Sequence, residues 1–304
     1  RRDQRPVPEL AADACRLALA EAGIDATEVD GICAESFTFG KRVPPDNIAH
    51  RIGMTQRPFT AEVGIAGSGT VGALMLAQAA IDSGLATTVL SYYAINLSVR
   101  SGNVYGIHAE EPAKATFEMP MGYYGQPVYF AAQAMRYLYQ YGAEADDFGA
   151  VAVSARLHAQ RTENALVRDP LTIDDYRQNA FIAEPLRKLD CCLVNDCGVA
   201  VVMTSLERAR DLPYPPVVIG GVGFASKPLT QAQYFTQGDI LRTPAVESGR
   251  DAYARAGVGP ADVDVAQVYD CSTISMLLQL EDLGLSEHGV GAADAAAGRF
   301  DPGG

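Results

Sequence analysis

The chain contains the same short segment twice. The segment Ala-Gly-Ile-Asp-Ala-Thr-Glu-Val-Asp that begins at Ala22 returns at Ala256 as Ala-Gly-Val-Gly-Pro-Ala-Asp-Val-Asp, 256 − 22 = 234 positions later. An alanine-rich amphipathic stretch precedes each copy and a short apolar run follows it, which is the order helix, turn, strand. Gly23 and Gly257 stand where each helix would end, because glycine takes positive φ without a Cβ clash. The repeat predicts a duplicated α/β unit and therefore two similar halves.

The size and composition suit two α/β units. The 304 residues, of which 48% are hydrophobic and 20% charged, can bury a substantial core, so the chain is expected to be globular. No run approaches the roughly 18 apolar residues of a membrane helix, and Arg1-Arg2 lacks the apolar stretch of a secretory signal, so we expect a cytoplasmic protein. A net charge of −13 argues against nucleic acid or an anionic membrane as partners, although a single phosphorylated ligand stays compatible with it.

The cysteines predict reduced thiols and no metal site. Their spacing shows neither the Cys-x2-Cys pairs of a zinc site nor the density of a disulfide scaffold. The closest approach to a metal cluster is Cys191-Cys192 with Cys197, yet neighbours on a strand point in opposite directions and no histidine is near. Reduced thiols fit a cytosol.

Hydrophobic periodicity divides the chain into helices and strands. Helices are predicted at 8–22, 70–83, 127–141, 146–160, 207–212, 243–256 and 274–283. Strands are predicted at 31–33, 59–65, 87–94, 193–205, 216–224 and 265–269. The tyrosine-rich, irregular region of about 96–188 indicates an inserted loop domain. We therefore predict an N-terminal half at 1–212 and a C-terminal half at 213–304. Symmetry with the first half implies at least two further strands and a helix after Gly304, so we expect the second half to be incomplete.

A strand-to-helix elbow is the first candidate for chemistry. Ala66-Gly-Ser-Gly69 separates the strand predicted at 59–65 from an alanine-rich helix, whose N-terminus exposes unpaired backbone N–H groups. Such an elbow can carry a nucleophile or hold an oxyanion. A tight turn with small residues for close helix–sheet packing is the simpler interpretation of this segment taken alone.

The order of the motifs resembles that of the thiolase superfamily. The elbow, the segment Asp190-Cys-Cys-Leu-Val-Asn-Asp196, the helix near 204–210 and Tyr269-Asp-Cys-Ser272 follow one another as they do in that family. Over essentially its whole length the chain looks like the sterol-carrier-protein-x and lipid-transfer-protein branch. The resemblance implies an α/β fold of five layers, αβαβα, built from two duplicated halves with an inserted loop domain. It also implies a homodimer core and action on acyl-coenzyme A thioesters.

The sequence departs from a thiolase at the nucleophile. In a thiolase the elbow presents a cysteine, and the matching position here is Ala66, whose methyl group cannot attack a thioester. Ser68 has no base fixed beside it, so helix capping is its expected role. An elbow without its thiol, facing Tyr269 in place of Asn or His, resembles the aldolases of this branch, which cleave β-hydroxyacyl-CoA steroid side chains. Retro-aldol cleavage needs a base, an acid and donors for the developing enolate, but no acyl-enzyme.

The resemblance suggests a role for each matching residue. Tyr269 and Asp270 are the candidate catalytic residues, and Ala66, Gly67, Ser68, Tyr124 and Cys271 are the candidates for binding the substrate or its oxyanion. A phenol with a reference pKa of about 10 is a poor base, so Tyr269 would more easily donate a proton. The alternative for Tyr269 is a tyrosine packed at a strand end. Asp270 is expected to accept backbone hydrogen bonds at the turn, and Cys271 to be a small buried residue.

The resemblance also implies partners, and two alternative functions remain open. The leading hypothesis is a retro-aldolase that acts on a bulky acyl-CoA, with no cofactor beyond the coenzyme A of its substrate. Its relatives pair with a small OB-fold protein that carries a zinc ribbon, so a heterotetramer is expected. The first alternative is a thiolase or acyltransferase that uses Cys271 or a thiol beyond Gly304. The second is a non-catalytic subunit that binds CoA esters.

Overall fold

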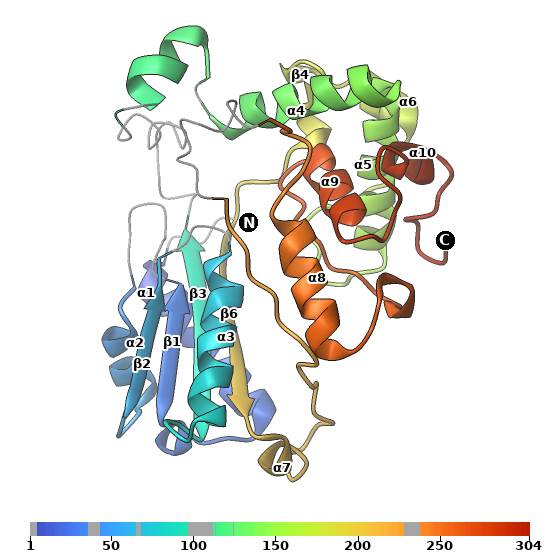
Figure 1. The fold of residues 1–304 in the computed structure, drawn as a ribbon. Coiled ribbons are helices and arrows are strands. Elements are labelled where there is room, and N and C mark those ends of the chain that lie inside the picture. Colours follow the sequence, from blue (N-terminus) through green and yellow to red (C-terminus); the bar gives the residue numbers. More distant parts are fainter. Residues whose placement is uncertain are drawn as a thin grey trace. The chain divides into compact units, whose positions relative to one another are not determined.

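The chain forms two compact units, which are described separately. The computed structural model describes residues 5–35, 43–64, 68–96, 112, 114–123, 125–227 and 238–304 (Figure 1). The first unit comprises Arg1–Gly102 and Val194–Ile219, and the second comprises Asn103–Leu193 and Gly220–Gly304. Each predicted half is one continuous stretch of sequence, whereas each compact unit combines two separate segments of the chain. The two units and the two predicted halves are therefore different divisions of the chain.

A four-stranded sheet forms the centre of the first unit. Its strands are β1 (Gly31–Glu35), β2 (Phe59–Val63), β3 (Thr88–Asn96) and β6 (Asp196–Thr204), in the order β2-β1-β3-β6. β1 runs parallel to both β2 and β3, and β6 runs antiparallel to β3. The parallel strands bring their carboxyl ends to one edge of the sheet, which is where β2 leads toward the predicted elbow.

Helices cover both faces of this sheet. α1 (Val7–Ala22) and α2 (Pro45–Ile52) pack on one face, and α3 (Gly69–Asp82) crosses the other (Figure 1). Side chains of β1 alternate between these layers, so that Ile32 and Ala34 join the core under α1 while Cys33 joins the core under α3. Because both faces are covered, every residue of β1 is buried, and its sequence is almost continuously apolar. The short helix α7 (Leu206–Ala209) follows β6.

A glycine allows α1 to approach the sheet closely. A Cβ atom at Gly198, in β6, would lie 2.5 Å from the carbonyl oxygen of Leu10 in α1. That distance is shorter than any real Cβ contact, and the obstacle is backbone, which cannot move aside as a side chain would. The packing of α1 on β6 therefore requires glycine at position 198.

The second unit is mostly helical. Its helices are α4 (Gln126–Tyr141), α5 (Ala145–Gln160), α6 (Ile173–Arg177), α8 (Ala245–Ala256), α9 (Thr273–Asp282) and α10 (Gly291–Ala296), and its hairpin consists of β4 (Phe181–Ala183) and β5 (Leu186–Arg187). Short helical turns occur at Lys114–Glu118, Met119–Met121, Lys188–Asp190 and Pro260–Asp262, and at Ala26–Glu28 in the first unit. The core gathers large buried side chains from α4, α5 and α9, among them Tyr137, Phe148, Ile274 and Leu277. None of the described helices combines the length and apolarity that a membrane span requires.

The two copies of the repeat have the same local structure. Gly23 ends α1 with φ 67° and ψ 29°, and Gly257 ends α8 with φ 69° and ψ 28°. This left-handed conformation favours glycine, as the sequence predicted. The following turn is also repeated, because the N–H of Asp25 donates to the Glu28 carboxylate at 3.0 Å and the N–H of Gly259 donates to the Asp262 carboxylate at 2.8 Å. Equivalent atoms form equivalent bonds 234 positions apart, which confirms the helix and turn of the repeat.

Two predicted strands are absent from the structure. Segments 216–224 and 265–269 have no strand pairing, and Val217 and Val265 are 97% and 78% exposed. Within the part of the chain that the structure describes, no neighbouring strand lies beside either segment. An apolar segment becomes a strand only when a neighbour supplies N–H and C=O groups in register, as β2 and β3 do for β1. The other predicted strands and helices are present with small shifts of their ends. The helices α2, α6 and α10 and the hairpin of β4 and β5 were not predicted.

Candidate active site

The Tyr269–Ser272 segment lies at the start of α9, in the second unit. Ser272 caps the helix, because its Oγ accepts a hydrogen bond from the N–H of Ser275 at 3.2 Å. The side-chain amide of Gln279 holds the backbone of Tyr269 on both sides: its oxygen accepts from the Tyr269 N–H at 3.0 Å, and its nitrogen donates to the Tyr269 carbonyl at 2.7 Å. The position of Tyr269 is therefore fixed by α9. Gln279 was not predicted, and its one sequence signal is an amide within the apolar run Met276–Leu280.

The side chain of Tyr269 stays protonated near neutral pH. The residue is 61% exposed, yet partial burial of its phenol raises the pKa to about 12, and the neighbouring Cys271, Cys192 and Asp270 act in the same direction. A phenol in this state is a hydrogen-bond and proton donor, and its exposed face leaves it accessible to a ligand. The exposure of Tyr269 contradicts the alternative, in which this tyrosine is packed in the core.

A second segment lies antiparallel to Tyr269–Ser272. Cys191 forms a β-bridge with Ser272, and the N–H of Cys192 donates to the Cys271 carbonyl at 3.1 Å. Burial raises the pKa of the Cys191 thiol and of the Cys271 thiol, each to about 11. Both thiols are therefore protonated at neutral pH and are weak nucleophiles. Cys271 is 7% exposed, in the buried position that the sequence suggested.

Asp270 does not cap the turn before α9. The residue is exposed, and the backbone N–H groups of the turn are bound by Ser272 and Gln279 instead. The expectation that Asp270 accepts these bonds is therefore wrong. Ser272 is better placed because its extended backbone, with φ −154° and ψ 158°, turns its hydroxyl back over the first turn of the helix.

The predicted elbow belongs to the first unit, and only part of it is described. Ser68 directly precedes α3, whereas Ala66 and Gly67, like Tyr124 of the loop domain, lie outside the described residues. Ser68 has helical backbone angles, φ −105° and ψ −4°, and its side chain does not cap α3. The expected capping role is wrong, because a capping serine needs an extended backbone to reach the N–H groups of the first turn. The Ser68 hydroxyl therefore accepts no hydrogen bond from those N–H groups.

Glu35 is a buried carboxylate beside the same helix start, and sequence reasoning missed it. It ends β1, is 6% exposed and accepts a hydrogen bond from the Thr70 hydroxyl at 2.7 Å. A Cβ atom at Gly69 would lie 2.7 Å from Cγ of Glu35, so glycine makes room for the carboxylate. The N-terminus of a helix favours negative charge, which explains how this carboxylate can be buried here. The sequence signal for Glu35 was an acidic residue at the end of an otherwise apolar strand.

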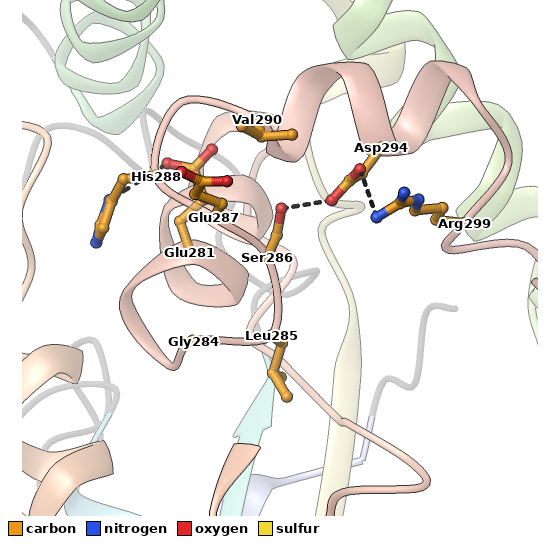
Figure 2. Close-up of a pocket in the computed structure, with 9 residues that line it drawn as sticks. All are labelled: Glu281, Gly284, Leu285, Ser286, Glu287, His288, Val290, Asp294 and Arg299. Atoms are coloured by element: carbon orange, nitrogen blue, oxygen red, sulfur yellow. Dashed lines mark hydrogen bonds and ion pairs between the residues drawn. The ribbon is translucent and has the colours of Figure 1, made fainter. Parts of the chain in front are cut away.

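A separate hollow lies at the far end of α9. Its volume is about 650 Å³, and Figure 2 shows Ser286 and Arg299 directed at Asp294, with distances of 2.6 Å and 3.2 Å. The lining residues are Glu281, Gly284, Leu285, Ser286, Glu287, His288, Val290, Asp294 and Arg299. α9 has 10 residues and is therefore about 15 Å long, so this hollow is roughly one helix length from Tyr269. It contains none of the predicted site residues, and we do not assign it to the site.

Known proteins similar to this chain point to one family. A family described as thiolase C-terminal domain-like matches residues 226–304. A steroid side-chain-cleaving aldolase from Thermomonospora curvata is 33% identical over 97% of this chain and 77% of the relative. A 17-hydroxy-3-oxo-4-pregnene-20-carboxyl-CoA lyase from Mycobacterium tuberculosis is 35% identical over 97% of this chain and 78% of the relative. The chain therefore spans about three quarters of the length of these relatives.

Solved structures agree with the sequence relatives. The structure of a protein named Ltp2-ChsH2(DUF35) aldolase superimposes with a TM-score of 0.87 at 32% identity, covering 97% of this chain and 76% of the other. A monomeric SCP2-thiolase-like protein from Mycobacterium smegmatis has a TM-score of 0.69 at 20% identity, covering 94% and 61%, and supports the fold alone. These likenesses confirm the predicted thiolase-like α/β fold. Because relatives that share about a third of their residues with it match nearly its whole length, the chain belongs to the thiolase superfamily, in the group that contains the steroid side-chain-cleaving aldolases.

Proposed function

We propose that this protein is a carbon–carbon lyase that cleaves a bulky β-hydroxyacyl-CoA, the CoA thioester of a steroid side chain, by a retro-aldol reaction. The observation that carries the proposal is the match of 97% of the chain to two relatives, one named an aldolase and the other a CoA-ester lyase. Ala66 at the position of the thiolase nucleophile supports the same conclusion, because it leaves this chain without the thiol that a Claisen condensation would use at the elbow.

The proposed reaction needs no covalent intermediate. A base takes the proton of the β-hydroxyl, the bond between the α and β carbons breaks, and the β carbon becomes a ketone. The electron pair of that bond moves into the thioester as an enolate, and an acid then protonates the α carbon. Hydrogen-bond donors at the enolate oxygen lower the barrier, each by about 3–4 kcal/mol.

We assign the acid role to Tyr269. With a pKa of about 12 its phenol is protonated at neutral pH and can donate to the enolate. The clamp of Gln279 on both sides of the Tyr269 backbone supports this role, because general acid catalysis requires a donor that is held in place.

A thiolase that uses another cysteine is the alternative function, and the thiols of the second unit argue against it. Burial raises the pKa of Cys271 and of Cys191 to about 11 and also raises that of Cys192, whereas a nucleophilic cysteine requires a lowered pKa. Within the described residues these thiols also have no histidine among the groups that shift their pKa values. Nothing in the described part of the second unit therefore activates a thiol.

We also propose partners for the lyase. One similar structure carries a name, Ltp2-ChsH2(DUF35) aldolase, that joins an aldolase to a DUF35 component, so we infer that this chain works with a small OB-fold and zinc-ribbon protein of that kind. Among the described strands β2 lies at one edge of its sheet, and an edge strand is where a second copy of the chain would extend the sheet, so we propose a homodimer core. All six cysteines are free thiols, in keeping with a cytoplasmic protein.

One assay separates the proposed function from both alternatives. The full chain and its DUF35-type partner are incubated with 17-hydroxy-3-oxo-4-pregnene-20-carboxyl-CoA, and products and intact protein are analysed by mass spectrometry. We expect a ketosteroid, a shortened acyl-CoA and an unmodified protein. An acyl adduct on the protein would favour the thiolase, and a lack of turnover would favour a non-catalytic subunit.

A further inference from the structure

Asp190 is a buried carboxylate that links two distant segments of the second unit. It is 2% exposed and lies directly before Cys191. Its Oδ1 accepts a hydrogen bond from the Thr273 hydroxyl at 2.8 Å. Its Oδ2 accepts from the Tyr176 hydroxyl at 2.8 Å and from the N–H of Arg187 at 2.6 Å. One carboxylate therefore binds α6, the end of the β-hairpin and the first residue of α9.

Hydrogen bonds hold the Asp190 carboxylate in place, which suits a structural role and not proton transfer. Burial raises its pKa, but hydrogen bonds from Arg187, Thr273 and Tyr176 and the charge of Arg187 oppose that effect. Tyr176 is fully buried, and burial raises the pKa of its phenol, so it remains a donor. The start of α9 adds the favourable end of a helix dipole. Both oxygens are already bound within the protein, which leaves Asp190 no role at the substrate.

The residues that follow Asp190 extend the same link toward Tyr269. Asp190 binds Thr273 through its side chain, Cys191 forms a bridge with Ser272, and Cys192 binds the carbonyl of Cys271. Three consecutive residues, 190–192, therefore hold three consecutive residues, 273–271, in antiparallel register. Tyr269 is the second residue beyond this pairing, so the pairing sets the direction in which the chain reaches Tyr269.

We propose that Asp190 is a positioning residue for Tyr269: its carboxylate fixes the register between residues 190–192 and 271–273, and thereby the place of the Tyr269 phenol. The link between Asp190 and the register stands on the geometry alone. Its consequence for catalysis rests on the proposed function, in which Tyr269 is the acid. The two parts therefore need separate measurements.

The test uses two variants that break the link and two that control for it. Asp190→Asn replaces one accepting oxygen with an amide that cannot accept from all three donors, and Thr273→Val removes one donor with little change of shape. Thr273→Ser keeps the hydroxyl and should therefore retain the exchange rate, the alkylation rate and the kcat of the wild type. Asp294→Asn changes another buried carboxylate of the same unit. Asp294 is 7% exposed and accepts a hydrogen bond from Ser286, and it forms no hydrogen bond with residues 269–273.

The first measurement does not depend on activity. Hydrogen exchange of the peptide that contains Cys192 and alkylation of Cys271 are followed by mass spectrometry in the full chain. We expect both to be at least about tenfold faster in Asp190→Asn and in Thr273→Val, and unchanged in Thr273→Ser and Asp294→Asn. If Asp190→Asn fails to fold, Thr273→Val carries the comparison. Wild-type protection in a folded Asp190→Asn or in Thr273→Val would overturn the proposed register.

The second measurement is the lyase assay with its partner protein. We expect kcat to fall about 10- to 100-fold in Asp190→Asn with KM changed less than about threefold, because misplacement of an acid slows the chemical step. Thr273→Ser should keep the wild-type kcat. Faster exchange with an unchanged kcat would show that the register does not position the acid and would overturn the catalytic part. A wild type without turnover would refute the proposed function, while the exchange and alkylation rates would still decide the structural part.

Discussion

The removal of the Tyr269 hydroxyl tests the proposed chemistry most directly. Tyr269→Phe keeps the ring, and because the residue is 61% exposed the fold should be retained. A positioned general acid contributes about 10²- to 10⁴-fold to a rate, which is about 3–5 kcal/mol of transition-state stabilisation. We therefore expect kcat to fall by at least about 100-fold, with a smaller change in KM.

The raised pKa decides between the two roles that a tyrosine could have. With a pKa of about 12, only about one phenol in 10⁵ is ionised at pH 7, so a base role would depend on a rare species. As an acid, Tyr269 works in its protonated form, which is complete below the pKa and lost as the pH rises through about 12. The wild-type rate should therefore show no loss that is due to Tyr269 between pH 7 and about pH 10.

The assay is a pH series of initial rates on the 17-hydroxy CoA ester, with products separated by chromatography. Tyr139→Phe is the matched control, because Tyr139 is 84% exposed on α4 of the same unit and its variant should keep the wild-type rate. A rate within about twofold of wild type in Tyr269→Phe would refute the acid role. So would a wild-type rate that rises with a pKa near 8 or 9 and loses that dependence in Tyr269→Phe, since this would identify the phenolate as the active form.

Three further predictions concern the stability of the fold, each measured by urea unfolding. Gly198→Ala should lower the free energy of unfolding by about 1–3 kcal/mol, because the new methyl group meets the Leu10 carbonyl at 2.5 Å, and an unchanged midpoint would contradict the close approach. Tyr137→Phe should cost about 1–3 kcal/mol, because the buried carboxylate of Glu281 loses the hydroxyl that donates to it at 2.5 Å. Partial burial raises the pKa of Asp30, but hydrogen bonds from two neighbouring threonines outweigh it and hold the pKa below its ordinary value. The stability advantage of the wild type over Asp30→Asn should therefore be present above about pH 4 and disappear as the pH falls further, and an equal difference at pH 2 and pH 7 would contradict this account.

Local structure could be predicted wherever the controlling residues are neighbours in the chain. The ends of α1 and α8 followed from Gly23 and Gly257, and the structure repeats the same backbone angles at both. Most helices were found because amphipathic spacing is a local property. The same kind of reasoning failed at 216–224 and 265–269, whose strand-like composition is realised only if another strand pairs with them.

The roles of single side chains were harder to predict, because their partners are remote. Asp190 binds Thr273 across 83 positions, and Glu35 binds Thr70 across 35. In the sequence both are ordinary acidic residues near a strand. Ser68 is the opposite case, since its position before a helix predicted a cap, and the backbone angles at that residue prevent it.

The sequence by itself determined the repeat, the helices, the missing thiol at position 66 and, through the order of its motifs, membership of the thiolase superfamily. These features depend on residue identity and on spacing along the chain. Only the tertiary structure decided that Gln279 clamps Tyr269, that burial keeps its phenol and the neighbouring thiols protonated, and that Asp190 ties residues 190–192 to the start of α9. The reason is physical: hydrogen bonds and desolvation depend on distances through space, and a sequence states only distances along the chain.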